Sequence, residues 1–217
     1  KNNELSIGYD TAVDVATNAL DMLQPTAASH RRAMILEVMG RDAGHIALNS
    51  GIAGGADVIL IPERPYTIKA VAKHIEKIRS NGRNHALIVV AEAVKKEDGS
   101  KATVKYIDGQ IRLGGIGSYI GDKIYKMTNA ETRVTVLGHV QRGAQPTHRD
   151  RLIASAFGVH AVDLIAQKKF NRVVVWQNRG VTDVDLESIA GKSKTVRDND
   201  PLIKVAKGLG IYVGEIN

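Results

Sequence analysis

Hydrophobic residues concentrate in five short segments of the chain, each rich in branched aliphatic side chains. Runs of this length and composition are typical of buried β-strands. The segments are Ala33–Val38, Asp57–Ile61, Ala86–Ala91, Arg133–Leu137 and Arg172–Trp176. We therefore expect five strands in the interior of the fold.

Between these segments, apolar residues recur every three or four positions, which predicts amphipathic helices. Asp10 and Thr11 are candidate N-caps for a helix that reaches Leu23, and a second helix is expected over Tyr66–Arg79. The longest helix is expected over Arg149–Ala166. Its buried stripe should consist of Leu152, Ala156, Val159 and Val162.

A last short helix is expected near the end of the chain, capped by Asp200, opened by Pro201 and ended by Gly208 and Gly210. Strands that alternate with helices indicate βαβ units. The fold class predicted for residues 1–217 is therefore α/β, a three-layer αβα arrangement around a mostly parallel sheet.

One polar stretch, at about residues 95–117, interrupts this alternation. It contains a hairpin pattern, Thr103–Ile107 followed by Asp108-Gly109 and then Gln110–Leu113. We expect an excursion on the edge of the sheet rather than a second domain.

Composition places the chain among globular proteins, with 217 residues of which 43% are hydrophobic and 24% charged. The absence of cysteine excludes disulfides and a cysteine nucleophile. The longest apolar run, around Ala86–Val94, is too short to span a bilayer, and no secretory signal pattern opens the chain. We expect a cytoplasmic protein that does not enter a membrane. Because the chain starts at Lys1 rather than Met, we also expect residues upstream of it.

The formal net charge of +7 is compatible with an anionic partner. The nine aromatic residues are scattered and basic residues occur singly or in pairs, whereas nucleic-acid binders interleave clustered charge with aromatics. Phosphorylated small molecules are therefore favoured over nucleic acid, and a merely solvated basic surface stays open as an alternative.

Polar residues with useful chemistry come directly after three of the predicted strands. In an open parallel sheet, ligands bind beyond the carboxyl ends of the strands. The first strand is followed by Met39–Gly44, the third by Glu92 and the fourth by Gly138–Gly143. Two arginines, a histidine and a carboxylate are therefore expected at one edge.

These groups suit a sugar phosphate, because arginine binds phosphate oxygens bidentately and a carboxylate accepts paired hydroxyls. Each has a structural alternative: a surface ion pair for Arg41, a helix-start charge for Glu92, a structural role for His139 and core packing for Met39.

The sequence does not match the motifs of other common catalytic and metal sites. Leu186 stands where a Walker loop needs glycine, no G-x-S-x-G elbow occurs, and no spacing suggests a metal cage.

Longer motifs add to these single residues. In chain order they are Ile7–Ala12, Ser29–Arg32, Met39–Gly44, Ala53–Ala56, Ile61–Glu63, Val90–Glu92 and Glu131–Gly143. Across roughly residues 6–176 they resemble the 6-phosphofructokinase family. The insert before Glu131 is more similar to the branch that contains both ATP- and pyrophosphate-dependent enzymes. The resemblance implies transfer of a phosphoryl group to the 1-hydroxyl of fructose 6-phosphate, giving fructose 1,6-bisphosphate in glycolysis.

The resemblance also implies roles for individual residues. The fructose 6-phosphate site would be lined by Met39, Gly40, Arg41, Glu92, His139, Val140, Gln141 and Arg142. Within it, Arg41 would also stabilise charge on the transferring phosphoryl group, Glu92 would bind sugar hydroxyls, and His139 with Arg142 would hold the 6-phosphate. Arg32 and Arg133 would reach the site of a neighbouring subunit, which implies a homodimer or homotetramer.

The resemblance has departures. Positions that match the nucleotide effector site of bacterial relatives fall at Gly55–Asp57, Asn81 and Arg83–His85, but Asn81 replaces a usual lysine and Gln24 a usual arginine. Ala144 replaces the second glycine that usually comes after the Gln-Arg-Gly motif.

The family's phosphate-donor loops, Mg²⁺-binding aspartate and catalytic base match nothing in this chain. It therefore resembles the sugar-phosphate half of the enzyme, with Mg²⁺ held by residues outside it and the donor, ATP or pyrophosphate, left open. Two other functions also stay open, a non-catalytic sugar-phosphate-binding or regulatory subunit and a basic nucleic-acid binder.

Overall fold

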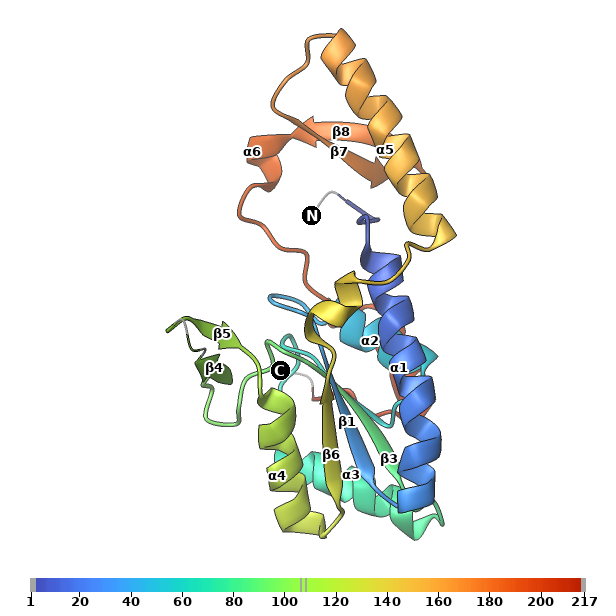
Figure 1. The fold of residues 1–217 in the computed structure, drawn as a ribbon, viewed down its shortest axis with the longest axis vertical. Helices are drawn as coiled ribbons and strands as arrows, with labels where there is room; N and C mark the ends of the chain where they lie inside the picture. Colours follow the sequence, from blue (N-terminus) through green and yellow to red (C-terminus); the bar gives the residue numbers. More distant parts are fainter. Residues whose placement is uncertain (1–2, 106, 108, 216–217) are drawn as a thin grey trace. The chain divides into compact units, whose positions relative to one another are not determined.

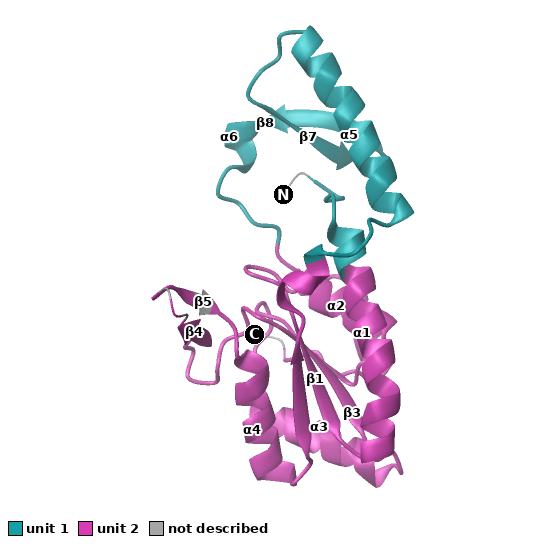
Figure 2. Ribbon diagram, in the orientation of Figure 1, with its two compact units in different colours: residues 1–12, 142–194 teal, residues 13–141, 195–217 magenta. Residues whose placement is uncertain are grey.

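The computed structural model describes residues 3–105, 107 and 109–215. These form two compact units (Figure 2). The first, which we call the sheet unit, consists of residues 13–141 and 195–217. The second, the small unit, consists of residues 1–12 and 142–194. Each unit is built from segments that are distant in the sequence.

The sheet unit contains a four-stranded parallel sheet. In spatial order its strands are β2 (Val58–Leu60), β3 (Ala86–Ala91), β1 (Ala33–Val38) and β6 (Thr132–Val136). Ala33 pairs in register with both Ala86 and Thr132, so the three strands β3, β1 and β6 begin and end at nearly the same level. Every residue of β1 and β3 is buried, as expected for parallel strands covered on both faces.

Helices cover both faces of this sheet (Figure 1). They are α1 (Tyr9–His30), α2 (His45–Ala53), α3 (Ile68–Ser80), α4 (Ile116–Thr128) and α7 (Pro201–Gly208). Helices α3 and α4 lie on one face, and α1, α2 and α7 lie on the other. A Cβ at Gly117 would lie 2.9 Å from Val134 Cγ1, so glycine lets α4 approach β6 closely. The three-layer αβα prediction is confirmed.

The C-terminal segment returns to the outer edge of the sheet. Ile59 N donates to Tyr212 O at 2.8 Å, and Tyr212 N donates to Asp57 O at 3.0 Å. Asp200 caps α7 as expected, its carboxylate accepting from Leu202 N at 2.9 Å. The segment therefore completes β2, which would otherwise be an open edge strand.

The start of α1 differs from the prediction. The helix begins at Tyr9, so Asp10 and Thr11 lie in its first turn and do not cap it. Both residues instead bind the segment that starts α5. Thr147 Oγ1 donates to Asp10 at 2.7 Å, and both the amide and hydroxyl of Thr11 donate to Asp150. A polar residue at a helix start can bind another segment instead of its own helix.

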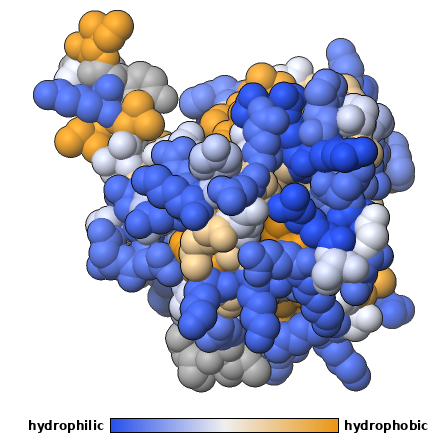
Figure 3. Space-filling model, turned by 90° about the horizontal axis from the view of Figure 1, so that it is seen from below, coloured by the Kyte–Doolittle hydropathy of each residue, from blue (hydrophilic) through white to orange (hydrophobic). Residues whose placement is uncertain are grey.

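The predicted hairpin lies between β3 and α4 in the sequence. Strands β4 (Thr103–Lys105) and β5 (Ile111–Leu113) pair antiparallel, and Asp108 of the expected turn lies outside the described residues. The side chains of Val104, Ile107 and Ile111 in this segment are exposed. Figure 3 shows hydrophobic atoms on the part of the molecule that projects at the upper left.

The small unit contains α5 (His148–Ala166), β7 (Arg172–Gln177), β8 (Gly180–Asp185) and α6 (Leu186–Ile189). The prediction that β7 joins the parallel sheet is wrong, because β7 pairs antiparallel with β8 in a separate two-stranded sheet. Asn178 and Arg179 both have positive φ, at 49° and 65°, as a two-residue type I′ hairpin turn requires. This turn sends the chain straight back along β7.

The predicted buried stripe of α5 is also wrong. Leu152, Val159 and Val162 are 68%, 66% and 64% exposed, whereas the buried apolar residues are Ile153 and Leu164. Both sides of α5 are apolar, and β7 and β8 cover only one of them. Helical periodicity marks an apolar side but does not say which of two will be covered.

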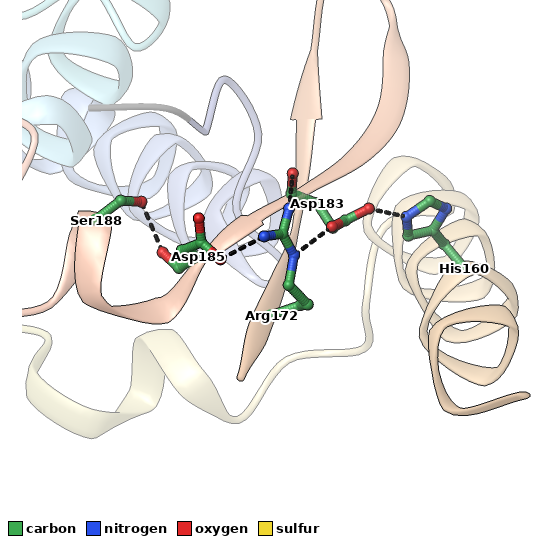
Figure 4. Close-up of polar contacts among 5 residues, drawn as sticks. All are labelled: His160, Arg172, Asp183, Asp185 and Ser188. Carbon is green, nitrogen blue, oxygen red and sulfur yellow. Dashed lines mark hydrogen bonds and ion pairs between the residues drawn. The ribbon is translucent and has the colours of Figure 1, made fainter. Parts of the chain in front are cut away.

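A polar network fastens α5 to this two-stranded sheet (Figure 4). His160 Nε2 lies 3.0 Å from Asp183 Oδ1, Arg172 Nε donates to Asp183 Oδ2 at 2.5 Å, and Arg172 also pairs with Asp185. Ser188 Oγ donates to the backbone oxygen of Asp185 rather than to His160. The group therefore holds elements together and is not arranged as a nucleophile with its base.

Candidate functional site

The carboxyl end of the central strand β1 is the meeting point of the predicted site residues in the sheet unit. Met39 N donates to Gln141 Oε1 at 2.7 Å, and Gly40 N donates to Glu92 Oε1 at 3.3 Å. Glu92 comes after β3 and Gln141 after β6, the two neighbours of β1. The structure thus brings Met39, Gly40, Glu92 and Gln141 together, as the rule for parallel sheets predicts.

Charged and polar side chains stand open around this point. Arg41 is exposed, and its guanidinium has no hydrogen-bond or ion-pair partner among the residues that the structure describes. His139 and Val140 are exposed on the 3₁₀ helix η1 (Gly138–Arg142), which comes after β6. An unpaired guanidinium and an imidazole near a carboxylate can bind a phosphorylated sugar.

Gln141 and Arg142 differ from the other members of the predicted set in their surroundings. The Gln141 side chain is 2% exposed and holds the Met39 amide, so it supports the loop after β1. Its contact with substrate stays a prediction. Arg142 ends η1 and is exposed, but it belongs to the small unit.

Arg32 and Arg133 lie at the opposite edge of the sheet from Met39 and Glu92. Arg32 precedes β1 and Arg133 is the second residue of β6. Both pair with the Glu131 carboxylate, Arg32 through Nε at 3.0 Å. The hydrogen bond from Arg32 lowers the pKa of Glu131. Within one copy, the six residues of β1 separate Arg32 from the Met39 end by about 20 Å at 3.3 Å per residue, and Arg133, which pairs with Met34, lies about 17 Å from that end.

A buried carboxylate that the sequence did not point out supports the same edge. Glu37, in β1, is 2% exposed and accepts from Gly115 N at 3.1 Å and Gly117 N at 2.8 Å. Burial raises its pKa, against the lowering effect of these two amides. The sequence did contain a signal for this contact, an acidic residue inside an otherwise apolar strand. A buried carboxylate needs hydrogen-bond donors from other segments.

A second missed carboxylate is Glu63, which accepts from Gly44 N at 3.0 Å. The predicted site drew on the residues after the first, third and fourth strands, but not on those after the second strand, where Glu63 lies. The residue lines a cavity of about 260 Å³ beyond β2 and β3, formed by residues 61–66, 94–97 and 99. The same rule, applied to every strand, would have found it.

Comparison with known proteins agrees with this geometry. The profile of the family described as "Phosphofructokinase" matches residues 1–165. The chain belongs to the phosphofructokinase family. It is 56% identical over 212 residues to ATP-dependent 6-phosphofructokinase 1 of Nostoc sp., an alignment that covers 98% of this chain and 59% of that protein. With ATP-dependent 6-phosphofructokinase 1 of Synechocystis sp. the identity is 54%, covering 97% and 58%.

The fold matches solved phosphofructokinases as well. Phosphofructokinase from Saccharomyces cerevisiae superposes with a TM-score of 0.74 at 28% identity, covering 95% of this chain and 25% of that one. This phosphofructokinase chain therefore spans less than two thirds of the length of its curated relatives, 59% in the case of the Nostoc protein.

Two of the positions that resemble the phosphofructokinase effector site, Asp57 and Arg83, pair with each other within the chain. Asp57 forms an ion pair with Arg83, and its other carboxylate oxygen accepts from Leu87 N at 2.8 Å. Asn81 is the C-cap of α3, and Gln24 is exposed on α1.

Among the residues that the structure describes, acidic and imidazole side chains do not gather into a metal site. Across residues 3–105, 107 and 109–215, no three His, Asp or Glu side chains come close enough to hold a metal ion. The residues in these ranges therefore do not fit a Mg²⁺ site. Within the same ranges, no helix combines the length and apolar character needed to cross a bilayer.

Proposed function

We propose that this chain supplies the fructose 6-phosphate half of an ATP-dependent 6-phosphofructokinase. The complete enzyme would transfer a phosphoryl group to the 1-hydroxyl of fructose 6-phosphate, giving fructose 1,6-bisphosphate in cytoplasmic glycolysis. The observation that supports the proposal is that the segments bearing Arg41, Glu92 and His139 follow neighbouring strands at one edge of the sheet, in a chain of this family. ATP as donor is supported by the names of the cyanobacterial relatives.

The charged side chains would bind different parts of the substrate. The hydrogen bond from Gly40 N orients the Glu92 carboxylate, whose remaining lone pairs can accept sugar hydroxyls. His139 and Arg142 would hold the 6-phosphate. Arg41, whose guanidinium has no partner among the described residues, would stabilise negative charge on the phosphoryl group as it transfers. Because such a transfer depends on positioning and electrostatics, a fixed guanidinium is the main contribution of this half.

The remaining chemistry is assigned to residues outside this chain. Mg²⁺, the donor loops and the base that deprotonates the 1-hydroxyl have no matching residues here, and the described side chains do not fit a metal site. The share of the Nostoc relative covered by this chain, 59%, supports a donor portion outside residues 1–217.

A second copy of the chain would complete the substrate site. Arg32 and Arg133 lie at the amino-terminal edge of the sheet, too far from Glu92 to serve the same site in one copy. We propose that they reach the 6-phosphate bound by a neighbouring subunit in a homodimer or homotetramer.

Calorimetric titration of the 217-residue chain with fructose 6-phosphate tests the substrate site. Glu92→Ala and Arg142→Ala should each weaken binding by at least about tenfold, whereas the matched exposed arginine variant Arg151→Ala should leave it unchanged. Fructose without its phosphate should not bind. Equal affinity in all three variants would contradict the site. If the 217-residue chain alone does not bind fructose 6-phosphate, the same three variants are titrated in the complete enzyme, and the same outcomes support or contradict the site.

Turnover tests the role of Arg41. In the complete enzyme, Arg41→Ala should lower kcat by about 10³-fold, because one charge-stabilising donor is lost at the reacting group. The thermal midpoint should not change, since the side chain is exposed and unpaired among the described residues. Unchanged turnover in this variant would remove Arg41 from the mechanism.

A further inference from the structure

One carboxylate, that of Glu63, links the loop that carries Arg41 to the C-terminal segment. Its oxygens lie 3.0 and 3.1 Å from Gly44 N, and Oε1 also accepts from Val196 N at 2.8 Å. Gly44 is buried and Val196 is 5% exposed, so both backbone partners of the half-buried Glu63 are sheltered from water. Glu63 thus has two sheltered partners that lie far apart in the sequence.

The contact with Gly44 also serves as a helix cap. Gly44 is the N-cap of α2 and has no side chain to accept a hydrogen bond from that helix. The Glu63 carboxylate supplies an acceptor and a negative charge at this helix start, both of which are stabilising there. A Cβ at Gly44 would lie 2.2 Å from Ile61 Cβ, so the loop is pressed against the chain just after β2.

The loop between β1 and α2 is therefore held at both ends. Gln141 and Glu92 bind the amides of Met39 and Gly40 at its start, and Glu63 binds the amide of Gly44 at its end. Arg41 lies between these two anchor points and has no partner of its own among the described residues. The direction of its guanidinium depends on how firmly the loop is held.

We infer that Glu63 is a positioning residue that fixes Arg41 for phosphoryl transfer by anchoring Gly44. The inference rests on the proposed function of Arg41 and adds a residue that lies outside the substrate site. The neighbouring residue reinforces the arrangement, because the buried Arg64 donates to Val213 O and to Asp198 Oδ1, each at 2.7 Å. Glu63 and Arg64 together tie the C-terminal segment to the end of β2.

The chain offers a matched control in Glu97. Its carboxylate also accepts a backbone amide at a helix start, that of Ile68 N at 2.8 Å in α3, and it lines the same cavity as Glu63. It does not contact the Arg41 loop through any hydrogen bond between described residues. Glu97→Ala therefore removes the same kind of interaction without disturbing Gly44.

Kinetics of the complete enzyme test the inference. Glu63→Ala should lower kcat by about 10- to 100-fold, because a displaced loop misplaces the Arg41 guanidinium. KM for fructose 6-phosphate should change by less than about threefold, because Glu92 and His139 still bind the sugar phosphate. Glu63→Gln, which keeps one carbonyl acceptor, should retain most of the activity. Glu97→Ala should match the wild type.

The decisive measurement is the double variant Arg41→Ala/Glu63→Ala. If Glu63 acts through Arg41, its loss should not lower kcat further once Arg41 is absent. A full additional loss in the double variant, or an equal loss in Glu97→Ala, would overturn the inference. If Arg41→Ala alone leaves kcat unchanged, the proposed function fails instead, so the two failures are distinguishable.

Hydrogen exchange on the 217-residue chain gives an independent measurement. The Gly44 amide should exchange at least about tenfold faster in Glu63→Ala than in the wild type, faster by a smaller factor in Glu63→Gln, and at the wild-type rate in Glu97→Ala. The Gln variant carries this test if the Ala variant does not fold. Unchanged protection of Gly44 in a folded variant would also overturn the inference.

Discussion

The two units of this chain differ in how completely their apolar faces are covered. In the sheet unit, both faces of the parallel sheet carry helices, and residues such as Ile35, Leu36 and Ile88 are fully buried. In the small unit, α5 leaves Leu152, Val159, Val162 and Ile165 more than 60% exposed. The strands β1 and β3 at the centre of the parallel sheet are fully covered within the chain, whereas α5 of the small unit has one apolar side exposed. Exposed apolar surface of this kind is typical of a protein–protein interface.

The largest expected effect is in the core of the sheet unit. Leu36→Ala should lower the free energy of unfolding by about 3 kcal/mol, because it removes a fully buried side chain from the central strand. The matched change in the small unit, the exposed Leu152→Ala, should have almost no effect. Urea unfolding followed by circular dichroism checks both, and equal losses would contradict the comparison.

The next largest effect concerns a buried carboxylate in the small unit. Asp150 is 2% exposed and accepts from both the amide and the hydroxyl of Thr11. Asp150→Ala leaves these donors unpaired and should cost about 2 kcal/mol. Fluorescence of Trp176, the single tryptophan of the chain, reports unfolding of this unit because it lies on β7. Thr11→Ser, which keeps the hydroxyl, is the control and should cost less.

Acid should affect Asp183 of the small unit and Glu37 of the sheet unit in opposite directions. Hydrogen bonds from His160 and Arg172 lower the pKa of Asp183 in the small unit, whereas burial raises the pKa of Glu37 in the sheet unit. A lowered pKa gives stability above the unfolded value that is lost as pH falls through the folded value. A raised pKa gives stability that is lost as pH rises through the folded value.

Below about pH 4, the ordinary range for Asp, the small unit should therefore lose stability before the sheet unit does. Trp176 fluorescence and far-ultraviolet circular dichroism, followed together from about pH 7 to about pH 3, separate the two transitions. Coincident transitions at every pH would show that the units unfold as one. Asp183→Asn should remove most of the acid sensitivity seen by Trp176.

The smallest expected effect on stability is on the exposed face of α5. Val159→Lys should change the free energy of unfolding by less than about 0.5 kcal/mol, because the side chain is 66% exposed. It should, however, reduce self-association of the chain at high concentration, measured by light scattering. A loss of about 2 kcal/mol or more would mean that this face is covered within the chain.

The sequence was sufficient to predict the parallel sheet, because branched aliphatic runs and the alternation with helices have one common solution. It also placed Met39, Glu92 and Gln141 at one edge, since strand order and direction determine that edge. It could not predict the pairing of β7, because a two-residue turn at Asn178-Arg179 has no glycine to signal its positive φ. Neither could it predict the hydrogen-bond partners of Glu63, because Gly44 and Val196 are distant from it in sequence.

The discontinuity of the sheet unit has a consequence for synthesis on the ribosome. Tyr212 completes the outer edge of β2, but residues 142–194 must be translated before it appears. At ribosomal rates this takes on the order of seconds, during which the N–H and C=O groups of that edge have no strand beside them. The nascent chain is then most exposed to strand-to-strand aggregation, and a chaperone that shields β2 during translation would raise the yield of folded protein.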